Sequence, residues 1–116
     1  MSVHSANLLL TGYTDVLALR FSYEHASGKC DVAVTLAADR QCTKRLELEC
    51  RDVHALALDR FGGGLTQLLC LRVKSVAGDG RDRVRFVVED LERQALRFEC
   101  DDLFIEVDGH RLSVSP

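Results

Sequence analysis

The chain has 116 residues, of which 47% are hydrophobic and 28% charged, with a formal net charge of −3 and a pI of about 5.8. This length and composition suit one folded domain with its own core, and they exclude general disorder. The acidic balance, without a basic stripe or an RNA-binding aromatic motif, argues against a nucleic-acid-binding protein.

The N-terminal stretch Met1 to Leu10 has no positively charged region, and its apolar run covers only Leu8 to Leu10. It therefore does not resemble a signal peptide. No other stretch reaches the apolar length that spans a bilayer. We expect a soluble, cytoplasmic protein that does not contact a membrane.

Apolar and polar residues alternate along most of the chain, which is typical of strands with one buried face. Turn-forming residues separate the runs, and Asp108-Gly109 is a hairpin dipeptide. Residues 87–95 could form a helical turn, but we interpret them as a strand end plus a loop. The pattern predicts a single all-β domain over residues 1–116, an antiparallel β-sandwich or open barrel of about 8–9 strands. The alternating runs are 17–23, 30–36, 46–50, 69–73, 84–88, 96–100 and 103–107, and the other turns are 26–29, 38–41, 62–64 and 78–80.

One short pattern occurs twice: residues 46–53 read LELECRDV and residues 96–103 read LRFECDDL. In each copy the apolar residues move from even to odd positions, and a continuous strand would then turn the later ones to solvent. The chain must therefore break at Arg51-Asp52 and at Asp101-Asp102. A bulged corner is our preferred interpretation. A two-residue hairpin, with Cys50 opposite Val53 and Cys100 opposite Leu103, is the alternative.

Beyond the first copy the buried phase is ambiguous. Leu56 and Leu58 compete with Ala55 and Ala57 for the core. In either case we interpret the doubled pattern as scaffold rather than as a chemical site.

The five cysteines predict buried thiols rather than a metal or redox site. They form no Cys-x-x-Cys pair, and zinc sites usually have closely spaced ligands. Four of them fall within apolar runs, whereas Cys42 does not and is expected to be more exposed. The cysteines are Cys30, Cys42, Cys50, Cys70 and Cys100.

No pattern of catalytic or cofactor-binding residues stands out. The histidines are scattered, and no serine lies in a Gly-x-Ser-x-Gly motif. The run Gly62 to Gly64 lacks the lysine and serine or threonine of a phosphate loop. We therefore predict a non-enzymatic protein without a metal or cofactor.

A group of acidic residues in the last third of the chain is the only candidate binding surface. A calcium loop would require a glycine and a fixed order of oxygen ligands, which are missing. A solvated strand face that protects an edge is one interpretation, and a surface for a basic partner is the other. The candidate partner-binding residues are Glu89, Asp90, Glu92, Asp101 and Asp102.

The order of features resembles small bacterial all-β proteins found as immunity proteins beside polymorphic toxins. Those chains open with a His-Asp-Ala/Ser element and an aliphatic strand, matched here by residues 4–9, with Ser5 where the aspartate would stand. Those chains also have an apolar-x-Phe-x-x-Val strand break, an aromatic–Gly segment and a final Phe-x-Cys strand. The matching residues here are Leu46 and Leu48 through Val53, then Phe61-Gly62, then residues 98–100. The resemblance implies a non-enzymatic protein that binds and blocks a toxin or effector, and it carries over no catalytic residue.

Two other functions stay open at this point. The interior of a barrel could carry a small ligand or lipid, which would require a cavity. Alternatively, an exposed edge strand could pair with its own copy, which would make a homodimer or a self-associating structural domain.

Overall fold

The two breaks in the doubled pattern are places where the chain crosses from one sheet to another. The computed structural model describes residues 1–78, 80 and 83–116. Strand β3 (Arg45–Arg51) belongs to a six-stranded sheet, whereas the next strand, β4 (His54–Leu58), belongs to a four-stranded sheet. The chain returns from β8 (Leu96–Cys100) to β9 (Asp102–Val107) at the second break.

The corner interpretation is confirmed, and the hairpin alternative is wrong. Cys50 lies opposite Val32 on one side and Leu103 on the other, so it does not pair with Val53. Asp52 has a φ of 55°, a value at which aspartate is less strained than most residues, and it turns the chain out of the first sheet. Strands that change sheets at bends of this kind are typical of sandwiches.

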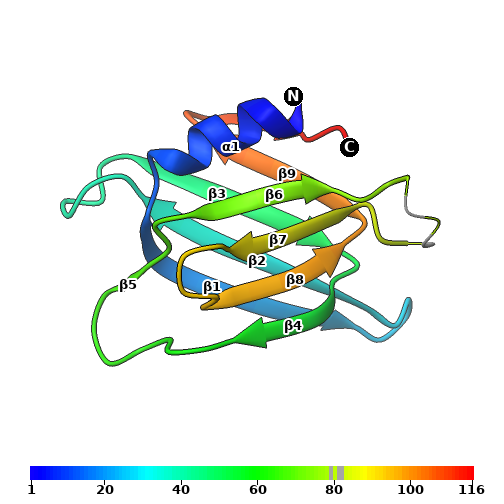
Figure 1. Ribbon diagram of the computed structural model, residues 1–116. Helices are drawn as coiled ribbons and strands as arrows, with labels where there is room; N and C mark the ends of the chain where they lie inside the picture. Colours follow the sequence, from blue (N-terminus) through cyan, green and yellow to red (C-terminus); the bar gives the residue numbers. More distant parts are fainter. Residues whose placement is uncertain (79, 81–82) are drawn as a thin grey trace.

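The predicted antiparallel sandwich is confirmed, with ten strands and one helix in the described residues (Figure 1). The larger sheet has the order β10-β9-β3-β2-β1-β5, and the smaller has the order β4-β8-β7-β6. The strand number exceeds the prediction because the two-residue β5 is too short to show an alternating pattern. The remaining strands are β1 (Asp15–Glu24), β2 (Lys29–Ala37), β5 (Thr66–Gln67), β6 (Leu71–Ser75), β7 (Phe86–Asp90) and β10 (His110–Ser113).

The core fills the space between the two sheets with the inward-facing residues of the predicted strands. Phe86 and Phe98 of the smaller sheet are fully buried, as are Leu36, Leu48 and Ile105 of the larger one. Each fully buried side chain of this size contributes roughly 1.5–3 kcal/mol relative to an exposed one. In β4, Leu58 lies opposite the buried Leu96, so the leucine phase faces inward there.

From Leu19 onward, strand β1 has the predicted phase but not the predicted burial. Before Leu19 a register shift falls at Leu17, so that Val16 rather than Leu17 packs against the core. Phe21 lies opposite the buried Val32 and so faces inward, yet Phe21 and Tyr23 are each 54% exposed. The smaller sheet has fewer strands and does not cover this edge of the larger one. Leu69 also differs from the prediction: the alternation placed it on the buried face, but it is exposed, and its neighbour Leu68 is buried instead.

The turns agree with the sequence where they are described. Residues 91–93 form a turn between β7 and β8, as we interpreted that stretch. Asp108 and Gly109 have φ values of 53° and 76° and join β9 to β10 as a two-residue hairpin. The predicted turn at 78–80 includes Asp79, which lies outside the described residues.

The N-terminal helix α1 (Val3–Thr11) was not predicted from the sequence. The resemblance implied an aliphatic strand after His4, and this expectation is wrong because Leu8 to Leu10 belong to the helix. Ser2 caps its first turn by accepting the backbone N–H of Ser5 at 3.0 Å. Among the described residues, no helix is long and apolar enough to cross a membrane.

Helix α1 lies along β6, the edge strand of the smaller sheet (Figure 1). Ala6 and Leu10 face the core. The Asn7 side chain pairs with the backbone of Val73: its Nδ2 donates to the carbonyl at 3.0 Å, and its Oδ1 accepts from the N–H at 2.8 Å. The helix thus satisfies backbone groups that an edge strand would leave exposed.

Candidate functional site

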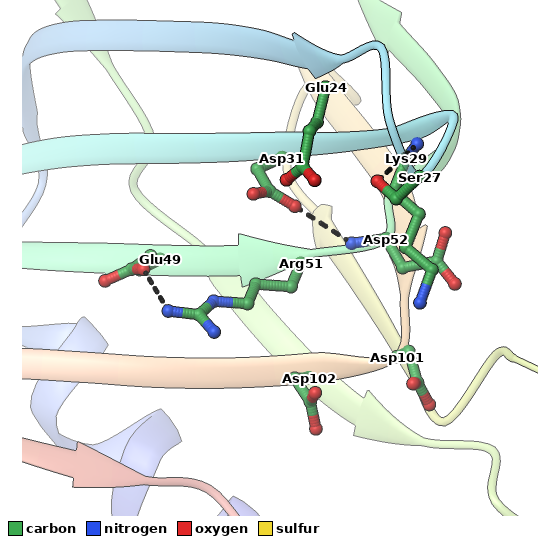
Figure 2. Close-up of a pocket in the computed structure, with 9 residues that line it drawn as sticks. All are labelled: Glu24, Ser27, Lys29, Asp31, Glu49, Arg51, Asp52, Asp101 and Asp102. Atoms are coloured by element: carbon green, nitrogen blue, oxygen red, sulfur yellow. Dashed lines mark hydrogen bonds and ion pairs between the residues drawn. The ribbon is translucent and has the colours of Figure 1, made fainter.

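A polar pocket lies at the end of the sandwich where both chain corners meet. Its volume is about 540 Å³, and it opens on the outside of the larger sheet (Figure 2). It is lined by Glu24, Ser27, Lys29, Asp31, Glu49, Arg51, Asp52, Asp101 and Asp102.

The strand phase explains why these polar residues gather there. Val32, Leu48 and Cys50 point into the core, so their neighbours Asp31, Glu49 and Arg51 point outward. The β1–β2 hairpin brings its end to the same place, and the corners contribute three aspartates. Strand pairing sets Arg51 opposite Asp102, and the backbone N–H of Asp101 donates to the Arg51 carbonyl at 3.0 Å.

The pocket lining is strongly acidic, with six carboxylates and two cationic side chains. Nearby arginines compensate only part of this charge. Glu49 pairs with Arg51 at 3.3 Å and with Arg111 at 3.1 Å, and Asp102 lies 3.7 Å from Arg85. Among the described residues, no ion pair within 4.0 Å involves Glu24, Asp31 or Asp101.

Asp52 is the anchor of the first corner. Its carboxylate is almost fully buried and accepts two hydrogen bonds from Arg83, from Nε at 2.8 Å and from the terminal nitrogen at 2.6 Å. These bonds hold the pKa of Asp52 below its usual value against the opposing effect of burial. Its backbone N–H donates to Asp31 at 3.2 Å, which ties the corner to β2.

Two arginines beside the pocket are held by an aromatic ring. The guanidinium of Arg111 lies 4.0 Å from the centroid of the Phe104 ring, and that of Arg51 lies 5.2 Å from it. Contacts of this kind stabilise a cation at an exposed site by roughly 0.5–1 kcal/mol. Arg51 and Arg111 are therefore positioned to neutralise Glu49 rather than to project freely into solvent.

The structure separates the five acidic residues that the sequence grouped together. Asp101 and Asp102 line the pocket. Glu89, on β7, has its carboxylate 3.8 Å from Arg97, and Glu92 is exposed in the β7–β8 turn. Strand β8 runs between that turn and Asp101, so Asp90 and Glu92 lie at the opposite end of the sandwich.

Asp90 requires a correction, because it does not lie on an exposed acidic face. It is 1% exposed, and its carboxylate accepts the backbone N–H groups of Glu92, Arg93 and Ala95 at 3.2–3.3 Å. These bonds organise the β7–β8 turn. Asp90 thus belongs to the scaffold, because the turn would otherwise leave N–H groups without acceptors.

The two cysteines of the doubled pattern meet inside the sandwich. Cys50 and Cys100 are fully buried, neighbouring free thiols. Burial, reinforced by this neighbour, raises the pKa of Cys50 well above its usual value, so the thiol stays protonated. Cys42 is half-buried rather than exposed, and Cys30 and Cys70, which were expected to be buried, are also only half-buried. Among the described residues, no group of three or more His, Cys, Asp or Glu side chains could hold a metal ion.

Most of the pocket residues were missed by the sequence reasoning. Glu24, Lys29, Asp31 and Glu49 are single polar residues in alternating strands, and nothing in their spacing distinguishes them from an ordinary solvated face. The available signal was the pair of corners, which had to lie at a sandwich end, together with the outward phase of residues just before them. Compared with protein-family models, curated proteins and solved structures, this chain has no match.

Proposed function

We propose that the protein is a non-enzymatic interaction module of the immunity type, which binds a basic patch on a toxin or effector domain. The acidic pocket at the corner end of the sandwich is the contact site. The proposal includes the resemblance to bacterial immunity proteins and a place in the cytoplasm, where free thiols persist.

The observation that carries the proposal is the excess of carboxylates in one polar pocket at the end of the fold. Arginine forms planar, bidentate hydrogen bonds with carboxylates, so arginine side chains of a partner suit this lining. A site of one charge sign also steers an oppositely charged partner and raises the association rate.

The packing of the interior favours this proposal over a carrier of small ligands or lipids. Such a carrier needs an apolar cavity, whereas Phe86, Phe98 and the aliphatic residues around them fill the space between the sheets. The acidic pocket lies outside the sheets and has a polar lining, which does not suit an apolar ligand.

The test is co-expression with the proteins encoded beside its gene, followed by binding measurements on any complex that forms. The triple variant Asp31→Asn/Asp101→Asn/Asp102→Asn removes three carboxylates from the pocket. An exposed ion pair contributes roughly 0.2–1 kcal/mol, so we expect about tenfold weaker binding at low salt and a smaller dependence on salt.

The control is Glu89→Gln/Glu92→Gln, which removes two carboxylates away from the pocket, one half-buried and one exposed. Its binding should equal that of the unchanged protein. If the triple variant binds as tightly as the control, with the same salt dependence, the pocket is not the contact site.

A further inference from the structure

The edges of the two sheets differ in how well they are protected from other strands. Strand β10 has four residues, β4 has five and carries a register shift, and β6 has five and is covered by Asn7 and α1. Strand β1 has ten residues, and β5 pairs only with its first two, Asp15 and Val16. Among the described residues, no strand pairs with this edge of β1 beyond Val16.

The free part of β1 also exposes apolar side chains. Phe21 and Tyr23 are each 54% exposed although they face inward, and Leu17 is 38% exposed. Strand β4, the edge of the smaller sheet on the same side of the sandwich, adds Leu58 at 45% (Figure 1). Long edges with exposed apolar residues are templates for pairing with another strand, and most proteins avoid them.

The backbone of β1 indicates which residues offer hydrogen bonds to an added strand. Before the register shift, the Thr14 carbonyl accepts a hydrogen bond from the backbone N–H of Leu68. It therefore points away from β2, to the side that β5 occupies at the start of β1 and that is open farther along. After the shift, the Glu24 carbonyl accepts from Gly28 in the β1–β2 turn and therefore points toward β2. Alternation then directs the N–H and C=O groups of Leu19, Phe21 and Tyr23 to the open edge.

The sequence of this edge is complementary to itself. When two β1 strands pair antiparallel around a two-fold axis at Ser22, Phe21 of each copy lies opposite Tyr23 of the other. These are the residues whose backbone groups point outward. On the opposite face, Arg20 lies across from Glu24 of the second copy. Aromatic pairs and opposite charges in such positions each stabilise a sheet by roughly 0.2–1 kcal/mol.

We infer that β1 is a homodimer interface, at which two copies join their larger sheets through an antiparallel, two-fold β1–β1 pairing centred on Ser22. The second copy is the occupant that fits, because charge and aromatic residues match across the two-fold axis. Arg20 bonds Glu47 at 2.6 Å, but its side chain is 65% exposed and remains accessible to a second carboxylate. Dimer formation does not require the proposed partner, although Glu24 belongs both to the pocket lining and to the β1 edge.

The test uses charge reversals, with mass measured by sedimentation velocity over a concentration series that reaches about 1 mM, where even weak association is populated. The unchanged protein should shift from monomer to dimer. Arg20→Glu alone and Glu24→Arg alone should each remain monomeric, because each places like charges opposite one another. An equimolar mixture of the two should form a heterodimer, since every facing pair is then opposite in charge.

Two further variants keep the test decisive. Phe21→Lys places an inward-pointing charge on the exposed edge and should give a folded monomer, as judged by circular dichroism. Glu92→Arg makes the same charge reversal as Glu24→Arg, but in the β7–β8 turn, and this variant should dimerise normally. The inference is overturned if the unchanged protein stays monomeric throughout, if the single reversals dimerise as it does, or if their mixture fails to associate.

Discussion

At the scale of single residues, Asp52 shows how one carboxylate can fix a corner. It takes the positive φ that bends the chain, it binds Arg83 through both oxygens, and its N–H reaches Asp31 on β2. The carboxylate must stay ionised to keep both arginine bonds. The geometry of the corner and the pH dependence of the protein's stability are therefore linked through Asp52.

This link predicts that Asp52 stabilises the fold at neutral pH and loses its effect in acid. Its pKa in the folded protein is below the value of about 3.9 in an unfolded chain, so between these values the unfolded chain binds more protons. The stabilisation is complete above about pH 5 and disappears as the pH falls through the folded pKa. Urea unfolding of Asp52→Asn should show its largest deficit at pH 7 and match the unchanged protein once the pH has fallen below the folded pKa of Asp52.

Asp59→Asn is the matched control for this measurement. Asp59 is exposed and lies 3.6 Å from Arg60, so its replacement should change stability little at any pH. A deficit of Asp52→Asn that stays constant from pH 7 down to the most acidic pH at which the protein is still folded would rule out the role of the ionised carboxylate.

Asp90 illustrates why the candidate residues could be found only in part from sequence. Asp90 and Asp101 both follow an alternating strand and have acidic neighbours, so their patterns are similar. The structure gives Asp90 three backbone donors and full burial, whereas Asp101 remains beside the pocket. This difference depends on how the turn folds back, which is a property of tertiary structure.

At the scale of elements, α1 acts as a cover for the edge of β6. The Asn7 amide imitates a neighbouring strand by pairing with both backbone groups of Val73. The alternation signal did not reveal the helix, because it is short and its apolar residues include the exposed Leu8. The serine at position 2, which caps the helix, and the spacing of Ala6 and Leu10 were the available signals.

Replacing Asn7 by alanine should therefore destabilise the protein. Two hydrogen bonds are lost and two backbone groups of a partly buried strand are left unpaired, which costs about 2 kcal/mol. Chemical denaturation measures this change. Leu8→Ala, on the exposed side of the same helix, should cost less than about 0.5 kcal/mol. Equal effects of the two substitutions would mean that Asn7 does not have this bridging role.

At the scale of the whole molecule, alternation and the phase shift were enough to predict the sandwich and its two corners. Strand phase is a local property, and a one-residue shift has few structural solutions. The uncovered edge at Phe21 and Tyr23 was not predictable, because alternation shows which way a side chain points but not what covers it. The pocket was missed for the same reason, since it combines both corners with the β1–β2 hairpin.

The central claim is that this corner end of the sandwich is a binding site for basic side chains. The most direct measurement is titration of the isotope-labelled protein with a short arginine-rich peptide, followed by amide NMR chemical shifts at low salt. The account predicts saturable shifts concentrated at Ser27, Asp31, Arg51 and Asp102, which salt reverses. Shifts spread evenly over the acidic surface, or concentrated at Glu89 and Glu92, would contradict it.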